Sequence, residues 1–161
     1  MRLKTMNEID DETVAYVLEN RKSFEDLRQV AAQLAGLLVL AAAGAKSGTA
    51  DHPMLEAAGE LYQEAVEGVR RARATSRARR HHHHVVHAAA AIGRALSTAR
   101  DHPGRLGSAR ELDRILTPLR AGYTHLQRAA DALPGFELIA FEQGCCAHYA
   151  HTPQDEVRTG R

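Results

Sequence analysis

The sequence predicts an all-α protein, folded as an antiparallel helical bundle around one long central helix. Two observations carry this prediction. Apolar residues recur at three- and four-residue spacing from about residue 53 to 100, as they do along one face of a helix. The same periodicity in residues 23–46 and 108–133 predicts two flanking helices, each about half as long as the central one.

The composition favours a single domain over residues 1–161. Hydrophobic residues make up 44% of the chain, enough for a core, and 25% of residues are charged. Aromatic residues contribute only 4% and there is no tryptophan, so the core must be built from alanine, leucine and valine. Within this domain we expect a short N-terminal helix inside residues 1–22 and a disordered polar tail over residues 152–161.

Helix-start signals place the first two helices. Acidic residues open the segment 7–20, which suits the positive end of a helix dipole. Ser23 then precedes an apolar-periodic run, with acidic residues inside the following turn, so we interpret it as the N-cap of the helix over 23–46. A lysine and a glycine after Ala45 are typical of a helix end.

The central helix begins after an Asp-His-Pro sequence at residues 51–53. If it is continuous to Arg100, it is about 70 Å long at ~1.5 Å per residue. A break near Thr75–Arg80 would give two helices of ordinary length and a four-helix bundle instead. Because no proline or glycine lies in that stretch, we favour the continuous helix.

The helix over 108–133 follows a loop that contains Pro103 and two glycines. Ser108 and Glu111 form a capping box, and leucines continue the apolar stripe to Leu133. Pro118 should kink this helix, because proline lacks an N–H and clashes with the preceding turn. The structure of residues 136–150 stays open between a last helix and an extended segment.

Two short helices against one long helix would leave apolar stripes exposed. A symmetric dimer would bury these stripes, so we expect a homodimer. A further protein partner is compatible with the same exposed faces.

Histidines at the centre of the predicted long helix form the first candidate site. Residues three or four apart share a helix face, so His83, His84 and His87 are candidate ligands for a transition metal such as zinc. The alternatives are a solvated or interface face without metal, and pH-dependent association of neutral histidines at a dimer centre. The sequence does not identify a cofactor.

A second candidate metal site lies near the C-terminus. Cys145, Cys146 and His148 combine thiolate and imidazole ligands at short spacing, a set suited to soft metals. Adjacent cysteines do not have the geometry of an ordinary structural disulfide, so we expect a reducing, cytoplasmic location. The two candidate sites would form one site only if the fold brought them together.

The third candidate is a surface for anions or a partner, formed by arginines spaced along the predicted long helix: Arg70, Arg73, Arg77 and Arg80. Such a stripe could follow phosphates. The net charge of +1 and the lack of a helix-turn-helix pattern or an aromatic platform argue against nucleic acid as the partner. The alternative is a set of ion pairs with acidic helix faces.

Sequence motifs give little support to an enzyme. Gly44-Ala45-Lys46-Ser47 lacks the glycines of a phosphate-binding loop, and no nucleophile elbow or dinucleotide fingerprint is present. The most apolar run, residues 34–45, is too short to span a bilayer. The sequence therefore predicts a small intracellular interaction or structural protein that self-associates. The alternatives are a metal- or cofactor-binding bundle and, third, a nucleic-acid-associated protein.

Overall fold

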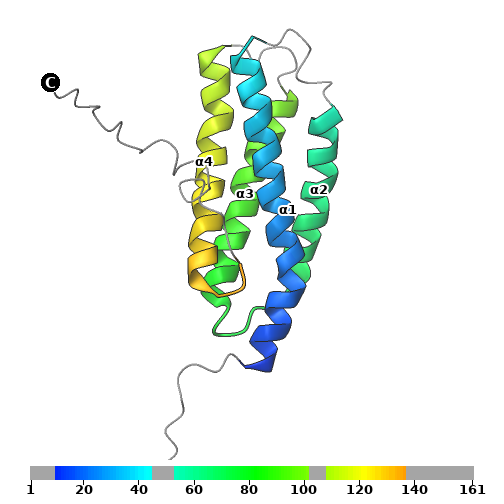
Figure 1. The fold of residues 1–161 in the computed structure, drawn as a ribbon, viewed down its shortest axis with the longest axis vertical. Coiled ribbons are helices and arrows are strands. Elements are labelled where there is room, and N and C mark those ends of the chain that lie inside the picture. Colours follow the sequence, from blue (N-terminus) through cyan, green and yellow to red (C-terminus); the bar gives the residue numbers. More distant parts are fainter. Residues whose placement is uncertain (1–9, 45–52, 102–107, 137–161) are drawn as a thin grey trace, which may run out of the picture.

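The protein is a four-helix bundle with up-down-up-down topology (Figure 1). The computed structural model describes residues 10–44, 53–101 and 108–136, and this part of the chain contains helices and no strand. The all-α antiparallel prediction is confirmed. None of the described helices has an apolar stretch long enough to cross a membrane. The helices are α1 (Asp11–Ala42), α2 (Pro53–Arg71), α3 (Arg79–Asp101) and α4 (Ala109–Ala132).

Helix α1 corrects the prediction of separate helices within 1–22 and over 23–46. It is one helix of 32 residues, and its N-cap is Asp10, whose carboxylate accepts a 2.8 Å hydrogen bond from the Thr13 amide. Ser23 does not cap a helix. It is buried in the middle of α1 against α2, where its hydroxyl occupies the space beside Gly68. No proline or glycine lies between Asn20 and Ser23, so nothing stops the helix there.

The continuous central helix is wrong, and the alternative break near residues 75–80 is what the structure shows. Helix α2 ends at Arg71 and α3 begins at Arg79. The turn is held by Thr75, whose hydroxyl accepts from the Ala78 amide at 3.2 Å and lies 2.9 Å from the Thr13 hydroxyl on α1. A threonine side chain that bonds to nearby backbone offers the chain an alternative to helix, so it can end one without proline or glycine.

The break also changes which residues of α3 face the core. In α2 the predicted stripe is buried at Leu55, Ala58, Ala65 and Val69. Its continuation past the turn predicts an inward face that contains residues 79, 83 and 86, but all three are exposed. The buried residues of α3 are instead His81, Val85, Ala88, Ala89, Ala91, Ile92, Ala95, Leu96 and Ala99. The α2 half of the predicted stripe is thus largely buried, whereas its α3 half faces outward, so the stripe does not form one continuous seam along a single helix.

Helix α4 matches the predicted helix over 108–133 closely. The Ser108 side chain accepts from the Glu111 amide at 3.3 Å, which confirms the N-cap. The helix continues across Pro118, and its buried face includes Leu119 and Leu126. Leu133 and Phe136, just after the helix, are also buried.

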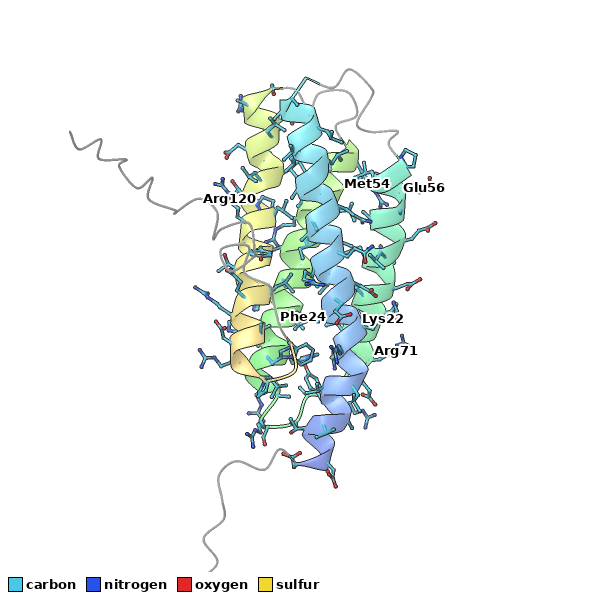
Figure 2. The ribbon with its side chains drawn as sticks, viewed as in Figure 1. Lys22, Phe24, Met54, Glu56, Arg71 and Arg120 are labelled. Carbon is cyan, nitrogen blue, oxygen red and sulfur yellow. The ribbon has the colours of Figure 1, made fainter. Side chains whose placement is uncertain are left out.

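The core runs along the bundle axis between all four helices. Near the lower end in Figure 1 it is aromatic: Phe24, which projects from α1 into the interior (Figure 2), packs against Phe136 with ring centroids 5.2 Å apart. On the opposite side of α1, Lys22 pairs with Asp26 of the same helix and with Glu64, and the second ion pair joins α1 to α2. Most of the remaining core consists of alanine, leucine and valine, as the composition predicts.

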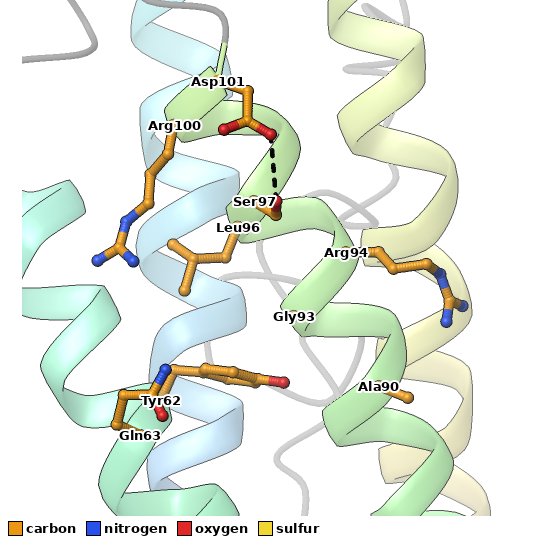
Figure 3. A pocket seen from close by; sticks show the side chains of 9 residues that line it. All are labelled: Tyr62, Gln63, Ala90, Gly93, Arg94, Leu96, Ser97, Arg100 and Asp101. Atoms are coloured by element: carbon orange, nitrogen blue, oxygen red, sulfur yellow. Dashed lines mark hydrogen bonds between the residues drawn. The ribbon is translucent and has the colours of Figure 1, made fainter.

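Helices α2 and α3 meet around a pocket of about 560 Å³ near the upper end of the bundle (Figure 3). The Tyr62 ring crosses from α2, and its hydroxyl donates a 3.0 Å hydrogen bond to the Ala89 carbonyl of α3. This hydroxyl lies in the space that a Cβ on Gly93 would occupy. In the same way the Arg100 guanidinium lies against Gly59. Glycine at these positions lets a large side chain of one helix rest on the backbone of the other.

Two glycine substitutions test this packing in opposite directions. Gly93→Ala should destabilise the fold by about 1–3 kcal/mol, because the added methyl group displaces the Tyr62 hydroxyl from its hydrogen bond. Gly36 is an exposed residue of α1, and no atom lies within 4 Å of the Cβ that alanine would add. Gly36→Ala should therefore stabilise the fold by ~0.5–1 kcal/mol, because alanine favours the helix more than glycine does. Chemical denaturation followed by circular dichroism measures both. Equal effects from the two substitutions would contradict the assigned Tyr62 contact.

Candidate functional site

The histidine run at the start of α3 is divided between the interior and the surface. His81 is fully buried, His82 and His84 are half-buried, and His83 and His87 are exposed. A helix turns by about 100° per residue, so four consecutive histidines must point in different directions. Only some of them can therefore serve one surface site.

The inward histidine belongs to a buried polar contact with Tyr16 of α1. The Tyr16 hydroxyl lies 2.9 Å from His81 Nδ1 and 3.2 Å from His82 Nδ1. A phenol has one proton, so it donates to one ring and accepts from the other. His81 also packs against Phe136 with ring centroids 3.9 Å apart, and its buried Nε2 atom has no hydrogen-bond partner among the described residues.

Burial controls the protonation of this contact. Desolvation, together with the charges of the nearby His82 and His84, lowers the pKa of His81 from 6.5 to about 4. Burial also raises the pKa of the Tyr16 hydroxyl. At neutral pH both groups are uncharged, which is the state that an aromatic core accepts at least cost.

The outward histidines meet a residue that sequence reasoning missed, His125 of α4. His84 Nδ1 lies 3.2 Å from His125 Nδ1. The His87 ring stacks on His125 at a centroid distance of 5.2 Å, and the His83 ring contacts His87 at 4.4 Å. The signal for His125 in the sequence is its place beside the predicted apolar stripe of α4, but which α3 residue it meets depends on how the two helices pack.

The His84–His125 pair has the separation of two ligands on one metal ion. Two nitrogens about 2.0–2.1 Å from a tetrahedral zinc ion lie roughly 3.3 Å apart. Burial lowers the pKa of both imidazoles, and so do nearby cationic groups, among them Arg128. Within the described residues, however, no three histidine, cysteine or acidic side chains are placed to share one ion. Of the predicted ligands, His84 is thus joined to a new partner, and His83 and His87 lie beside the pair.

The second predicted metal site lies outside the described residues. Cys145, Cys146 and His148 all fall within 137–161. The possibility that these groups join the histidines of α3 therefore stays a prediction.

The predicted arginine stripe is distributed over three segments instead of one helix face. Arg70 is on α2, Arg73 and Arg77 are in the connection, and Arg80 is on α3. All four are exposed. They surround the end of the bundle where α2 turns into α3, at the lower end of Figure 1.

Among the described residues, carboxylates interact with two of these arginines. Arg70 pairs with Glu67 of its own helix at 3.5 Å. Hydrogen bonds from Thr13 lower the pKa of Asp10, and the charge of Arg77 adds to this. Two carboxylates of α1 are paired elsewhere, Glu25 with Arg21 and Asp26 with Lys22.

The near-neutral net charge conceals a separation of charge across the bundle. Helices α1 and α2 together carry nine acidic and five basic residues, whereas α3 and α4 carry eight basic and four acidic ones. Residues 68–100 contain eight arginines and five histidines but no aspartate or glutamate. We use the name basic surface for seven exposed or half-buried residues, five from the α2–α3 turn and the start of α3 and two from α4: Arg73, Arg79, Arg80, His83, His84, His125 and Arg128.

A groove of about 970 Å³ separates α1 from α4. Helix α1 lines the groove with small residues, which leave space between the two helices: Ala31, Ala32 and Ala35. Helix α4 lines the other wall with larger residues: Leu116, Leu119 and Tyr123. Arg28 and Glu25 lie at its edge on α1, and Arg120 lies at its edge on α4 (Figure 2). The groove is open and mainly apolar, which is the chemistry of a helix-binding surface.

Comparison of the chain with protein-family models, with curated proteins and with solved structures found no match. The function must therefore be argued from the surfaces described above.

Acid titration tests the buried His81 contact. The folded-state pKa lies below the unfolded value, so the contribution of this group is fully present above pH 6.5 and is lost as the pH falls toward about 4. The free energy of unfolding should fall by up to ~3 kcal/mol across this window. His81→Leu should reduce this pH dependence, and exposed His83→Gln should leave it unchanged. Identical pH profiles for wild type and His81→Leu would contradict the assignment.

Proposed function

We propose that the protein is a helical-bundle interaction protein that self-associates through the outer face of α1. The observation that carries this proposal is a self-complementary stripe along α1, beside the groove. Residues at three- and four-residue spacing form it: Val14, Leu18, Arg21, Glu25, Arg28, Ala32, Ala35 and Val39.

The ends of this stripe are apolar and exposed. Leu18 is 69% exposed and Val39 is 68% exposed, and Val14 is 43% exposed. Single exposed apolar residues are ordinary on protein surfaces, but these share one helix face that is continuous with an apolar groove. Their burial would be favourable by ~25 cal/mol per Å² of apolar surface.

The stripe complements a second copy of itself in antiparallel orientation. The pairs Val14–Val39, Leu18–Ala35 and Glu25–Arg28 are all centred on the same point, between Asp26 and Leu27. A two-fold axis at that point would place each valine against the other, and each Glu25 against Arg28 of the second copy. The small residues Ala32 and Ala35 allow the two helices to approach closely.

This arrangement differs from the dimer expected from a long central helix. There, the exposed stripe was expected along residues 55–100, of which the four-helix bundle largely buries the α2 half and turns the α3 half outward. The sequence does not distinguish an exposed apolar stripe on α1 from a second buried one, because α1 has apolar residues on more than one face.

A charge-reversal series tests the proposed interface. The wild-type particle should have twice the chain mass of 17.6 kDa at micromolar concentration. Glu25→Arg and Arg28→Glu should each weaken the dimer by placing like charges together, and the double variant should restore it. Leu18→Glu should give a monomer. Val86→Glu, at an exposed position of α3 outside the stripe, should leave the dimer intact. Light scattering after size exclusion measures the mass, with circular dichroism to confirm folding.

A monomeric wild-type chain at these concentrations would overturn the proposal. A dimer that all the α1 variants preserve would also overturn it, because the interface would then lie elsewhere. If the protein's own residues 137–161 covered the groove in place of a second copy, the measured mass would be that of a monomer.

A second candidate function, metal binding, has one specific observation in its favour, the 3.2 Å separation of the His84 and His125 Nδ1 atoms. Neutral imidazoles at this separation offer two lone pairs to one ion, and water or another ligand would complete the coordination. The neighbouring Arg80 and Arg128 oppose a cation at this place.

Cobalt(II) titration, followed by visible absorption, tests the histidine pair. His84→Ala and His125→Ala should each lower the affinity at least tenfold if the pair holds the ion, since each removes half of the protein's ligands. His83→Gln, which leaves the pair intact, should have a smaller effect. Equal affinities in the wild type and both alanine variants would contradict metal binding at this pair.

A further inference from the structure

Arginines around the α2–α3 turn lack the carboxylate partners, among the described residues, that a purely structural role would require. Arg73, Arg79 and Arg80 are exposed, and no described carboxylate lies within ion-pair distance of them. Acidic residues lie at the start of α1, which the Thr13–Thr75 contact joins to the α2–α3 turn. There, Asp10 is engaged by Thr13 and by the charge of Arg77, and Asp11 and Glu12 occupy the first turn.

The start of α3 concentrates positive charge further. A helix N-terminus carries a partial positive charge, and acidic side chains in the first turn normally offset it. Helix α3 has no acidic residue in its first turn and has Arg79 and Arg80 there instead. These arginines repel the positive end of the helix, and an external anion bound there would offset that repulsion.

The positive charge continues from the turn onto the outer side of α3 and α4. The charges of Arg128 and Arg80 both help to lower the pKa of His84, and the His84 ring lies against His125. Asp131 lies one turn beyond Arg128 on α4 and forms no ion pair with it among the described contacts. The basic surface therefore extends over three segments of the chain, and its cations are not neutralised locally.

We infer that the basic surface binds the phosphate backbone of double-stranded nucleic acid without sequence preference. Guanidinium groups bind phosphate oxygens through paired hydrogen bonds, and the residues around the turn supply arginine without a single lysine. The surface has no exposed aromatic ring besides histidine on which unpaired bases could stack, so a duplex fits better than a single strand.

Double-stranded nucleic acid also fits this surface better than an anionic membrane does. Surface-binding segments combine basic residues with large apolar ones that enter the lipid. The residues between the arginines of 70–80 are alanine, threonine and serine only. The inference does not depend on self-association through α1, which lies on the acidic half of the bundle.

Fluorescence anisotropy with a labelled random-sequence 20-bp duplex, on the order of two turns of DNA, tests the inference on the full chain. If the surface makes about four phosphate contacts, raising the salt concentration from 50 to 200 mM should lower the affinity on the order of 100-fold. The triple variant Arg73→Ala/Arg79→Ala/Arg80→Ala should lose most of the affinity, at least tenfold. The control Arg94→Ala/Arg110→Ala/Arg120→Ala changes the net charge equally at exposed positions elsewhere and should retain it.

Three results would overturn the inference. One is the absence of salt-dependent duplex binding at 50 mM salt. The second is equal loss in the two triple variants, which would show a response to net charge alone. The third is stronger binding, in the same assay, to vesicles containing phosphatidylserine or to polyglutamate, which would identify a membrane or an acidic protein as the preferred partner.

Discussion

The contact between Tyr16 and His81 is the constraint on which the arrangement of the helices depends. It joins the first helix to the start of the third across the lower end of the core. Phe24 and Phe136 close around it, so the end of α4 is bound to the same point. An imidazole inside an aromatic cluster is costly unless it is neutral and hydrogen-bonded, and the Tyr16 hydroxyl meets the second condition. The contact therefore fixes which face of α3 points inward.

The neighbouring Thr13–Thr75 contact acts together with this one. It holds the α2–α3 turn against the beginning of α1, only a few residues from Tyr16. With both contacts in place, residues 53–101 cannot continue as one helix, because the chain must reverse at the turn for His81 to reach the core. The break is thus a consequence of tertiary contacts. No proline or glycine marks it in the sequence, and for this reason the local pattern favours a continuous helix.

The parts of the fold that follow from local rules could be predicted, and the parts that follow from packing could not. The Ser108 cap and the extent of α4 depend on neighbouring residues, and the sequence predicts both. The burial of Ser23 depends on Gly68 of another helix, and the contact of His84 depends on His125, forty-one residues away. The four arginines of the predicted stripe are exposed, but their distribution around a turn depends on the break that the sequence did not favour.

The exposed α2–α3 connection also determines how the chain would respond to proteolysis. Arg73 and Arg77 are exposed outside any helix, where a trypsin-like protease has no helical turn to unwind before it cleaves. Cleavage there would separate the sequence into two halves, each a helical hairpin, whose apolar faces form one shared core. The halves would remain associated after the cut, since the interior contacts between them do not pass through the peptide bond that is lost.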